Sequence, residues 1–312
     1  MKQKKSKSIT ILITPGDPGG IGPEITFKAL KSLYKKYSKQ VRFVVIGDEF
    51  KNRTSKKFAS IFPAPLESHL QLAGYQSGWS IEVACKLLLS GEANAMVTGP
   101  ISKENLQKGG YYFSGHTELL ASLCKTPKVT MMLANNQMRV TLVTTHTALK
   151  KVASQITQDS IEATLLQTQE GIKKLYGIKK PKVAVLGLNP HASDGGLFGN
   201  EEREMIAPAI KNMGASGPFP ADTFFALEMS KKPKDRFDAV VGMYHDQALA
   251  PVKLIDFFKT VNITLGLPII RTSVDHGTAF DIAGKNKADP SSMIAAIEAA
   301  ILFSKNEKRT YS

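Results

Sequence analysis

Length, composition and charge limit what this chain can be. Its 312 residues suffice for one large or two medium-sized domains, and 42% hydrophobic with 22% charged residues excludes an intrinsically disordered chain. The formal net charge of +14 would suit nucleic-acid binding, but the excess lysines fall in short runs without a recognition-helix or aromatic RNA-binding pattern. We interpret these runs as solvated edges and expect no nucleic-acid partner; they comprise residues 2–7, 173–182 and 231–234.

The two cysteines and the N-terminus indicate the compartment. Cys85 and Cys124 lie far apart in apolar helical patterns without CxxC spacing, so we expect reduced core thiols and a cytoplasmic protein. The apolar run at residues 9–13 is too short for a signal peptide, and no stretch is long enough to cross a membrane. We therefore expect no membrane partner.

Apolar runs and helical periodicity alternate along the chain. Continuous apolar runs predict strands at residues 9–13, 41–46, 93–97, 129–133, 140–143, 182–188 and 239–243. Helical spacing predicts helices from residue 25, from Ser77 as N-cap, at 118–123, from Asp159 to Gly177, after Asn200 as N-cap, at 222–229 after a turn at 217–220, and after an Asp289-Pro290 cap. Because the strands are apolar throughout rather than alternating, we predict an α/β fold with mainly parallel sheets covered on both faces.

Two strand-to-helix connections could bind an anion. The first, TPGDPGGIGPE at residues 14–24, is glycine-rich, but it matches neither the G-x-G-x-x-G nor the Walker pattern, and its prolines remove donors. The second, Ser114-Gly115-His116-Thr117, precedes a helix and could offer free backbone N–H groups. A tight turn and a capping role for Ser114 remain the alternatives.

Residues 238–284 carry more isolated polar chemistry than a structural strand pair needs. An apolar run stops at Tyr244-His245-Asp246-Gln247, and the segment closes on the glycine-containing loop Asp275-His276-Gly277-Thr278-Ala279. Between them, Lys253, Asn262 and Arg271 stand singly among apolar neighbours. We interpret this segment as the wall of an active site.

Three histidines share one sequence context. His146, His191 and His245 each follow the end of an apolar run, and the carboxyl ends of parallel strands line one edge of a sheet. Three neutral imidazoles with an open position are typical of a catalytic transition-metal site, with zinc the first choice. No local motif confirms the site, and a hydrogen-bonded loop role for each histidine remains the alternative.

Eight segments, in order over nearly the whole chain, resemble the 4-hydroxythreonine-4-phosphate dehydrogenase family. They are TPGDPGGIGPE, TGPISK, SGHTE, LNPHASDGGLFGNEE, GPFPADT, YHDQALAP, VNITLGLP and RTSVDHGTAFDIAG. The last also resembles the nucleotide-binding loop of the isocitrate/isopropylmalate dehydrogenase class, which accounts for the missing Rossmann fingerprint.

This resemblance implies two α/β/α domains with an active-site cleft between them, residues 1–130 with 275–312 and residues 131–274. It implies an NAD-dependent oxidation and decarboxylation of 4-phosphooxy-threonine in pyridoxal phosphate biosynthesis. A homodimer would complete each active site with residues of the partner chain, and we expect His146 to be the residue contributed across the dimer. Three rival functions remain open: a dehydrogenase of erythronate or threonate 4-phosphate, a metal-dependent phosphoester hydrolase, and a non-catalytic binding protein.

The resemblance also assigns site residues. A divalent metal, with magnesium or cobalt as alternatives to zinc, falls on His146, His191 and His245. The phosphorylated substrate falls on His116, Thr117, Lys253, Asn262 and Arg271. NAD falls on His276, Gly277, Ala279, Asp281 and Asp289. The general base is unassigned, with Asp246 and Lys103 as the candidates.

Overall fold

The computed structural model describes residues 8–47, 59–61 and 72–310, which form two compact units. Unit 1 combines the described residues up to Lys128 with those from Leu267 onward, and unit 2 is Val129–Gly266. The chain thus returns to unit 1 at Leu267 rather than at residue 275, because strand β11 (Arg271–Ser273) pairs with a strand of unit 1. The N-terminal lysines, Lys2 to Lys7, lie outside the described residues.

Unit 1 contains a parallel sheet with the strand order β3-β2-β1-β4-β11. Its strands are apolar and buried, as expected for a sheet covered on both faces. Their bounds are β1 (Ile9–Thr14), β2 (Val41–Ile46), β3 (Ala59–Ile61), β4 (Ala95–Thr98) and β11. These strands confirm the predictions for residues 9–13, 41–46 and 93–97.

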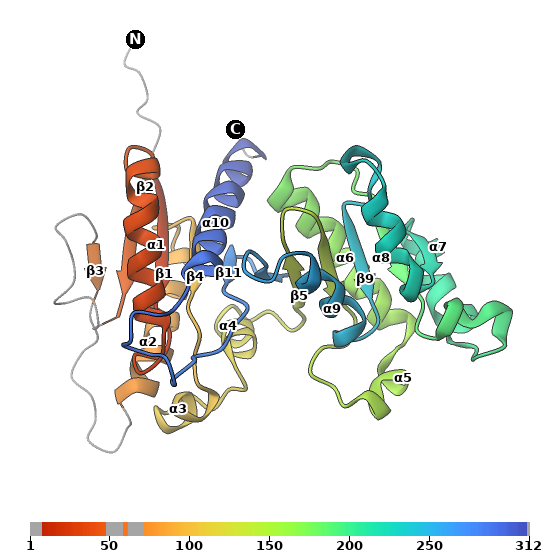
Figure 1. Ribbon diagram of the computed structural model, residues 1–312, viewed down its shortest axis with the longest axis horizontal. Helices are drawn as coiled ribbons and strands as arrows, with labels where there is room; N and C mark the ends of the chain where they lie inside the picture. Colours follow the sequence, from red (N-terminus) through yellow and green to blue (C-terminus); the bar gives the residue numbers. More distant parts are fainter. Residues whose placement is uncertain (1–7, 48–58, 62–71, 311–312) are drawn as a thin grey trace, which may run out of the picture. The chain divides into compact units, whose positions relative to one another are not determined.

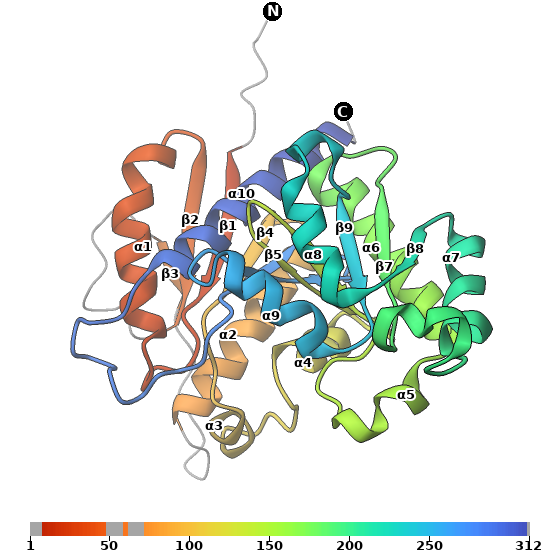
Figure 2. The ribbon, with the colours of Figure 1, turned by 45° about the vertical axis from the view of Figure 1, so that its right-hand side comes forward.

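Helices cover the sheet of unit 1 (Figures 1 and 2). Helices α1 (Gly22–Tyr37) and α10 (Ser291–Thr310) pack together, and α10 contacts β1, β4 and β11. Helix α2 (Leu72–Leu89) contacts β1, β2 and β4, and it carries α3 (Lys103–Lys108) and α4 (His116–Leu123).

Neither Ser77 nor Ser114 caps its helix, and Asp289 lies one residue before the N-cap position of α10, because the Pro290 carbonyl accepts the Ile294 N–H at 2.9 Å. Ser77 lies inside α2, where its hydroxyl donates to the carbonyl of Ala73 one turn earlier. Ser114 does not cap α4, because the N-cap position is Gly115 and no side chain bonds there. Asp289 Oδ1 does accept the Ser291 N–H at 2.7 Å at the start of α10.

Unit 2 contains the strand order β10-β5-β6-β9-β7-β8. Strands β6, β9, β7 and β8 are parallel, whereas β5 is antiparallel to both β6 and β10. The predicted turn at residues 217–220 is wrong in part, because residues up to Phe219 pair with β7 instead. The bounds are β5 (Thr130–Ala134), β6 (Arg139–Leu142), β7 (Val183–Leu186), β8 (Ser216–Phe219), β9 (Ala239–Gly242) and β10 (Val261–Leu265).

Alternate residues of the unit 2 strands enter two different cores. Val183, Val185 and Val241 pack with α5 to α7, whereas Ala184 and Val240 pack with α8 and α9. The bounds are α5 (Val152–Gln155), α6 (Gln158–Tyr176), α7 (Ala207–Met213), α8 (Ala221–Ser230) and α9 (His245–Ile255), with short helical turns η2 (Leu149–Lys151), η3 (Pro190–Gly196), η4 (Glu202–Ile206) and η5 (Pro233–Asp235).

Helix α6 illustrates how local sequence sets the boundaries. Thr157 and Ser160 form a reciprocal capping box at its start, and Gly177 ends it with a φ of 72°. The prediction of a helix from Asp159 to Gly177 is therefore confirmed. The acidic helical stretch after Asn200 begins at Glu201, and the Asn200 carbonyl accepts the Glu204 N–H at 2.8 Å, while its side chain accepts from Arg203 rather than from a backbone N–H.

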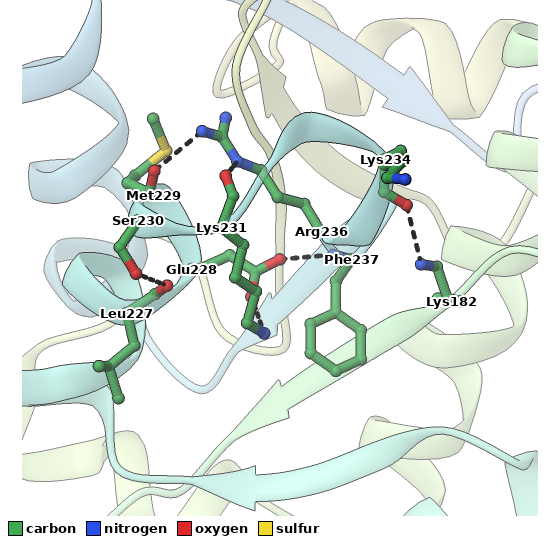
Figure 3. Close-up of polar contacts among 9 residues, drawn as sticks. All are labelled: Lys182, Leu227, Glu228, Met229, Ser230, Lys231, Lys234, Arg236 and Phe237. Atoms are coloured by element: carbon green, nitrogen blue, oxygen red, sulfur yellow. Dashed lines mark hydrogen bonds and ion pairs between the residues drawn. The ribbon is translucent and has the colours of Figure 1, made fainter.

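The amino ends of β7 and β9 form the lysine-rich edge of unit 2 (Figure 3). Lys182 Nζ lies 3.5 Å from the carbonyl of Lys234, so two of the lysine runs lie side by side. The buried Glu228 carboxylate accepts the Phe237 N–H and binds Lys231, which joins the end of α8 to the segment before β9. Lys182, Lys231 and Lys234 are exposed, as expected for a solvated edge.

The two thiols lie close together, with Cys85 buried and Cys124 half-buried. Cys85 and Cys124 are free, with their Sγ atoms 3.6 Å apart, and burial raises the pKa of Cys85 to about 12. Of the helices formed by the described residues, none is long and apolar enough to span a membrane.

Candidate active site

Arg271 is a buried cation in unit 1. It is 3% exposed, and its Nε and Nη2 atoms donate to Thr98 Oγ1 at 3.1 and 2.9 Å. Burial lowers the pKa of Arg271 to about 10, with the nearby Glu118 carboxylate opposing the shift, so the guanidinium is charged at neutral pH. A buried charge of this kind is suited to a phosphate or a carboxylate.

His116 begins helix α4 in the same unit. Burial lowers its pKa well below the usual value, and the charge of Arg271 lowers it further, so the imidazole is neutral. Its Nε2 atom is covered and has no hydrogen-bond partner among the described residues. A buried polar atom without a partner is costly, so Nε2 is a candidate to bind a ligand.

Two further candidates in unit 1 are Thr117 and Lys103. Thr117 follows His116 in α4 and is half-buried. Lys103 is exposed at the first position of α3, which Ser102 caps through the Asn105 N–H. Its role as the general base stays a prediction.

The glycine-rich loop after β1 is a structural turn rather than an anion cradle. The N–H groups of Asp17, Gly19, Gly20 and Ile21 are all used in intramolecular hydrogen bonds. Ile21 donates to the carbonyl of Thr278 at 2.9 Å, and a Cβ on Gly20 would lie 2.8 Å from the same oxygen. The loop therefore needs glycine at position 20 to reach the segment after β11.

That segment, residues 276–289, carries the cofactor candidates. His276 Nδ1 lies 3.0 Å from the carbonyl of Gly277, and its Nε2 is covered without a hydrogen-bond partner in the described residues. Ala279 has a φ of 43°, and Asp281 is exposed. Asp289 lies just before α10, and its bonds to Ser291 lower the pKa of its carboxyl.

Beside this segment lies a cavity of about 660 Å³ in unit 1. Its wall combines the glycine-rich loop, the first turns of α1 and the end of the segment. The lining residues are Pro18, Gly19, Gly20, Pro23, Glu24, Phe27, Lys28, Ala283, Gly284 and Asn286.

The three histidines of unit 2 follow neighbouring strands. Strand β6 pairs with β9 and β9 with β7, all parallel, so His146, His245 and His191 follow strand ends at one edge of the sheet. The rings of His146 and His245 are 5.9 Å apart between centroids. His191 instead places Nδ1 3.7 Å from Asp222 Oδ2 and stands 6.4 Å from the Phe198 ring.

One chain does not bring the three imidazoles together. Among the described residues, no group of three His, Cys, Asp or Glu side chains could hold a metal ion. His146 and His245 fit two ligand positions, since both are imidazoles on adjacent strand ends. Within one chain His146 thus lies beside His245, and His191 lies beside Asp222; the expectation that His146 is contributed across a dimer stays a prediction.

Asp246 orients a histidine. Its side chain is 88% exposed, and its Oδ1 lies 2.7 Å from His245 Nδ1. A carboxylate on one ring nitrogen fixes the orientation of the imidazole and leaves the other nitrogen for a ligand. Asp246, one of the two candidates for the unassigned general base, is thus engaged with His245.

His191 stands on an unusual backbone. Residues 191–195 all have positive φ, between 45° and 72°. The buried carboxylate of Glu202 holds the start of this turn, because its Oε1 accepts the N–H groups of Leu188 and Asn189 at 2.8 and 2.7 Å. No sequence pattern showed this left-handed turn.

The remaining substrate candidates lie in unit 2. Lys253 is in the last turn of α9, with Nζ 5.8 Å from the Phe257 ring centroid. Asn262 is half-buried in β10. Thr98, the first residue of TGPISK, and Asp222, which lies in GPFPADT, were not singled out from the sequence.

Known proteins resemble the chain over most of its length. The family model described as "Pyridoxal phosphate biosynthetic protein PdxA" matches residues 26–300. A 4-hydroxythreonine-4-phosphate dehydrogenase of Desulfosudis oleivorans is 44% identical, over 93% of this chain and 94% of the relative. The crystal structure of the Klebsiella pneumoniae enzyme of the same name has a TM-score of 0.82 and 36% identity, covering 95% of this chain and 100% of that one.

A more distant structure bears on the fold alone. Isocitrate dehydrogenase from Methylococcus capsulatus has a TM-score of 0.51 at 17% identity, covering 97% of this chain and 88% of that one. The predicted isocitrate dehydrogenase-like α/β fold is thereby confirmed. The chain belongs to the PdxA family, whose curated relatives are oxidoreductases named 4-hydroxythreonine-4-phosphate dehydrogenase.

Proposed function

We propose that the chain is a 4-hydroxythreonine-4-phosphate dehydrogenase that uses NAD and a divalent metal. It oxidises 4-phosphooxy-L-threonine to a 3-keto acid, which loses CO₂ to give 3-amino-2-oxopropyl phosphate for pyridoxal phosphate synthesis. The observation that carries the proposal is the pair formed by charged Arg271 and neutral His116, whose covered Nε2 has no partner in the described residues.

The residues of the chain bind and orient the substrate. Arg271 and Lys253 supply the cations that the phosphate and the carboxylate require, and His116 and Thr117 add neutral partners at the start of α4. Asn262 supplies an amide that can donate and accept. Lys103 is the remaining candidate for the base, since Asp246 is engaged with His245.

Two bound groups complete the chemistry. A divalent metal, zinc first, would be held by His146 and His245, with His191 supplied by a second copy of the chain, and it would acidify the substrate hydroxyl and polarise the ketone. The segment from His276 to Asp289 would hold NAD, which would supply the hydride acceptor that no side chain provides. The homodimer is part of this proposal.

One assay separates this function from its rivals. Purified protein with zinc and NAD is given the 4-phosphates of hydroxythreonine, erythronate and threonate, and NADH absorbance and free phosphate are followed together. We expect NADH and CO₂ from the first substrate with its phosphate intact. NADH from a sugar acid alone would change the substrate, phosphate release without NADH would indicate a hydrolase, and binding without turnover would indicate a binding protein.

A further inference from the structure

The connection from β11 to α10 must hold its shape without secondary structure. Residues 274–290 contain only turns, and they include the segment 276–289 that we assign to NAD, here called the nucleotide loop. Within the loop, Ile282, Ala283 and Lys285 donate backbone hydrogen bonds to residues three positions earlier. Those short turns do not fix the loop on the rest of unit 1.

Helix α1 and the residue before it supply the outside contacts. Near the start of the loop, the Ile21 N–H donates to the carbonyl of Thr278. At its far end, Lys28 Nζ donates to the carbonyls of Asn286 at 3.1 Å and Ala288 at 2.9 Å. The Ala288 N–H in turn donates to Glu24 Oε1 at 2.9 Å.

Glu24 and Lys28 also bind each other. They are one helical turn apart, with Lys28 Nζ 2.8 Å from Glu24 Oε1, and their side chains are 11% and 27% exposed. An ammonium has three donors, and those of Lys28 are matched by the Glu24 carboxylate and two loop carbonyls. Lys28 is therefore engaged as a connector and is not available as a phosphate receptor, although it lines the cavity.

We propose that Glu24 and Lys28 are positioning residues for the cofactor, because they tie the far end of the nucleotide loop to helix α1 and keep it in its binding conformation before NAD arrives. The inference rests on the proposed function, since it takes residues 276–289 as the loop that binds NAD. Neither residue was a candidate on the sequence.

The expected effect follows from the population of the binding conformation. When only a tenth of the molecules hold a loop in its competent form, the apparent affinity for its ligand falls about tenfold. Losing Lys28 removes two hydrogen bonds to residues 286–288 and the ion pair with Glu24, while the Ile21–Thr278 backbone bond remains. NAD affinity should therefore fall, whereas affinity for the phosphorylated substrate should not.

The test uses full-length protein and three variants. Lys28→Met keeps the aliphatic stem but removes the charge, Lys28→Arg restores donors, and Lys35→Met on the same helix is the matched control, since Lys35 is exposed. NADH binding is measured by fluorescence titration, KM is measured separately for NAD and for the substrate, and hydrogen exchange is followed in peptides covering residues 276–289. We expect about tenfold weaker NADH binding in Lys28→Met, a substrate KM within about twofold, faster exchange in the loop that NADH suppresses, and recovery in Lys28→Arg.

Two results would overturn the proposal in different ways. Equal NADH affinity in Lys28→Met and wild type, with wild type binding normally, refutes the positioning role and leaves the proposed function standing. A wild-type protein that does not bind NADH at all refutes both. Should Lys28→Met fail to fold, Glu24→Gln gives the same test, with about threefold weaker NADH binding expected because an acceptor for Ala288 remains; unchanged affinity there also refutes the role.

Discussion

The two units treat their polar site residues differently. In unit 1, Arg271 is buried and bonded to Thr98, and its charge acts on His116. In unit 2, the side chains of His191 and His245 are 65% and 38% exposed. Of the three histidine rings, those of His146 and His245 lie near each other. A buried charge needs hydrogen-bond partners in the folded chain, because leaving it unpaired is costly. An exposed imidazole is hydrated by water, so it carries no such cost before a metal or a partner binds.

The largest effect should come from removing a histidine that has no packing role. We expect His245→Ala to lower kcat about 10³-fold or more and to abolish metal content while leaving the melting temperature near that of wild type. Metal analysis by mass spectrometry, activity and calorimetry check this. A fully active His245→Ala protein with stoichiometric metal would show that His245 is not a metal ligand, and the contrast between the buried site of unit 1 and a metal site in unit 2 would be lost.

Mixed dimers should recover activity from two inactive chains. If His191 reaches the site of a second copy, co-expressed His191→Ala and His245→Ala chains should regenerate about a quarter of the sites by random assortment. His146→Ala with His245→Ala is the control and should regenerate none, because these two rings belong to one chain. Activity in the control alone would assign His146, and not His191, to the partner's site.

Arg271 should matter for substrate more than for NAD. Losing one charge-assisted contact costs about 1.5–3 kcal/mol, so Arg271→Ala should raise the substrate KM about 10- to 150-fold. Arg271→Lys should rescue little, because an ammonium cannot reproduce the planar fork with which Nε and Nη2 both bond to Thr98 Oγ1. A variant that loses thermal stability but binds substrate normally would make Arg271 structural.

Asp281 should set a preference for NAD over NADP. Its exposed carboxylate could accept a ribose hydroxyl and would repel a 2′-phosphate, so Asp281→Ser should narrow the preference about tenfold in kcat/KM. Steady-state kinetics with both cofactors measure this. Equal use of NAD and NADP by the wild type would contradict the ribose assignment.

The smallest effect concerns acid stability. Burial alone would raise the pKa of Glu24, but the Lys28 and Ala288 hydrogen bonds outweigh it and the pKa is lowered. A lowered folded-state pKa contributes stability above the ordinary value of 4.5 that is lost as pH falls below it. Glu24→Gln should therefore melt about 2 °C below wild type at pH 7, with the gap closing as the pH falls below 4.5; a gap that is independent of pH would refute this linkage.

Local sequence predicted the elements whose boundaries are local. Strand β2 covers the predicted apolar run, Val41–Ile46, and Gly177 ends α6 because a left-handed residue there suits glycine. Strand β8 was missed because pairing with β7, rather than its own composition, makes it a strand. The start of α2 was missed because Ser77 bonds inside the helix as readily as at its end.

In the candidate site, too, features that depend on local sequence could be predicted, and contacts between distant residues could not. Strand-end placement of the histidines follows from apolar runs and parallel topology, so it could be predicted. The pairing of His146 with His245 depends on loop conformation, and the bond from Arg271 to Thr98 joins residues 173 positions apart. Neither contact has a local sequence signature.

The left-handed turn after β7 has a stereochemical consequence. Four L residues, His191 to Asp194, occupy backbone angles that cost about 1–2 kcal/mol each for their chirality, whereas D residues prefer those angles. A protein assembled by ligation with D-alanine at position 192 should therefore be more stable than the all-L protein. A protein with D-leucine in place of buried Leu186 in β7 should be less stable than the all-L protein. This turn is thus a place where a mirror-image building block could enter the protein without changing its fold.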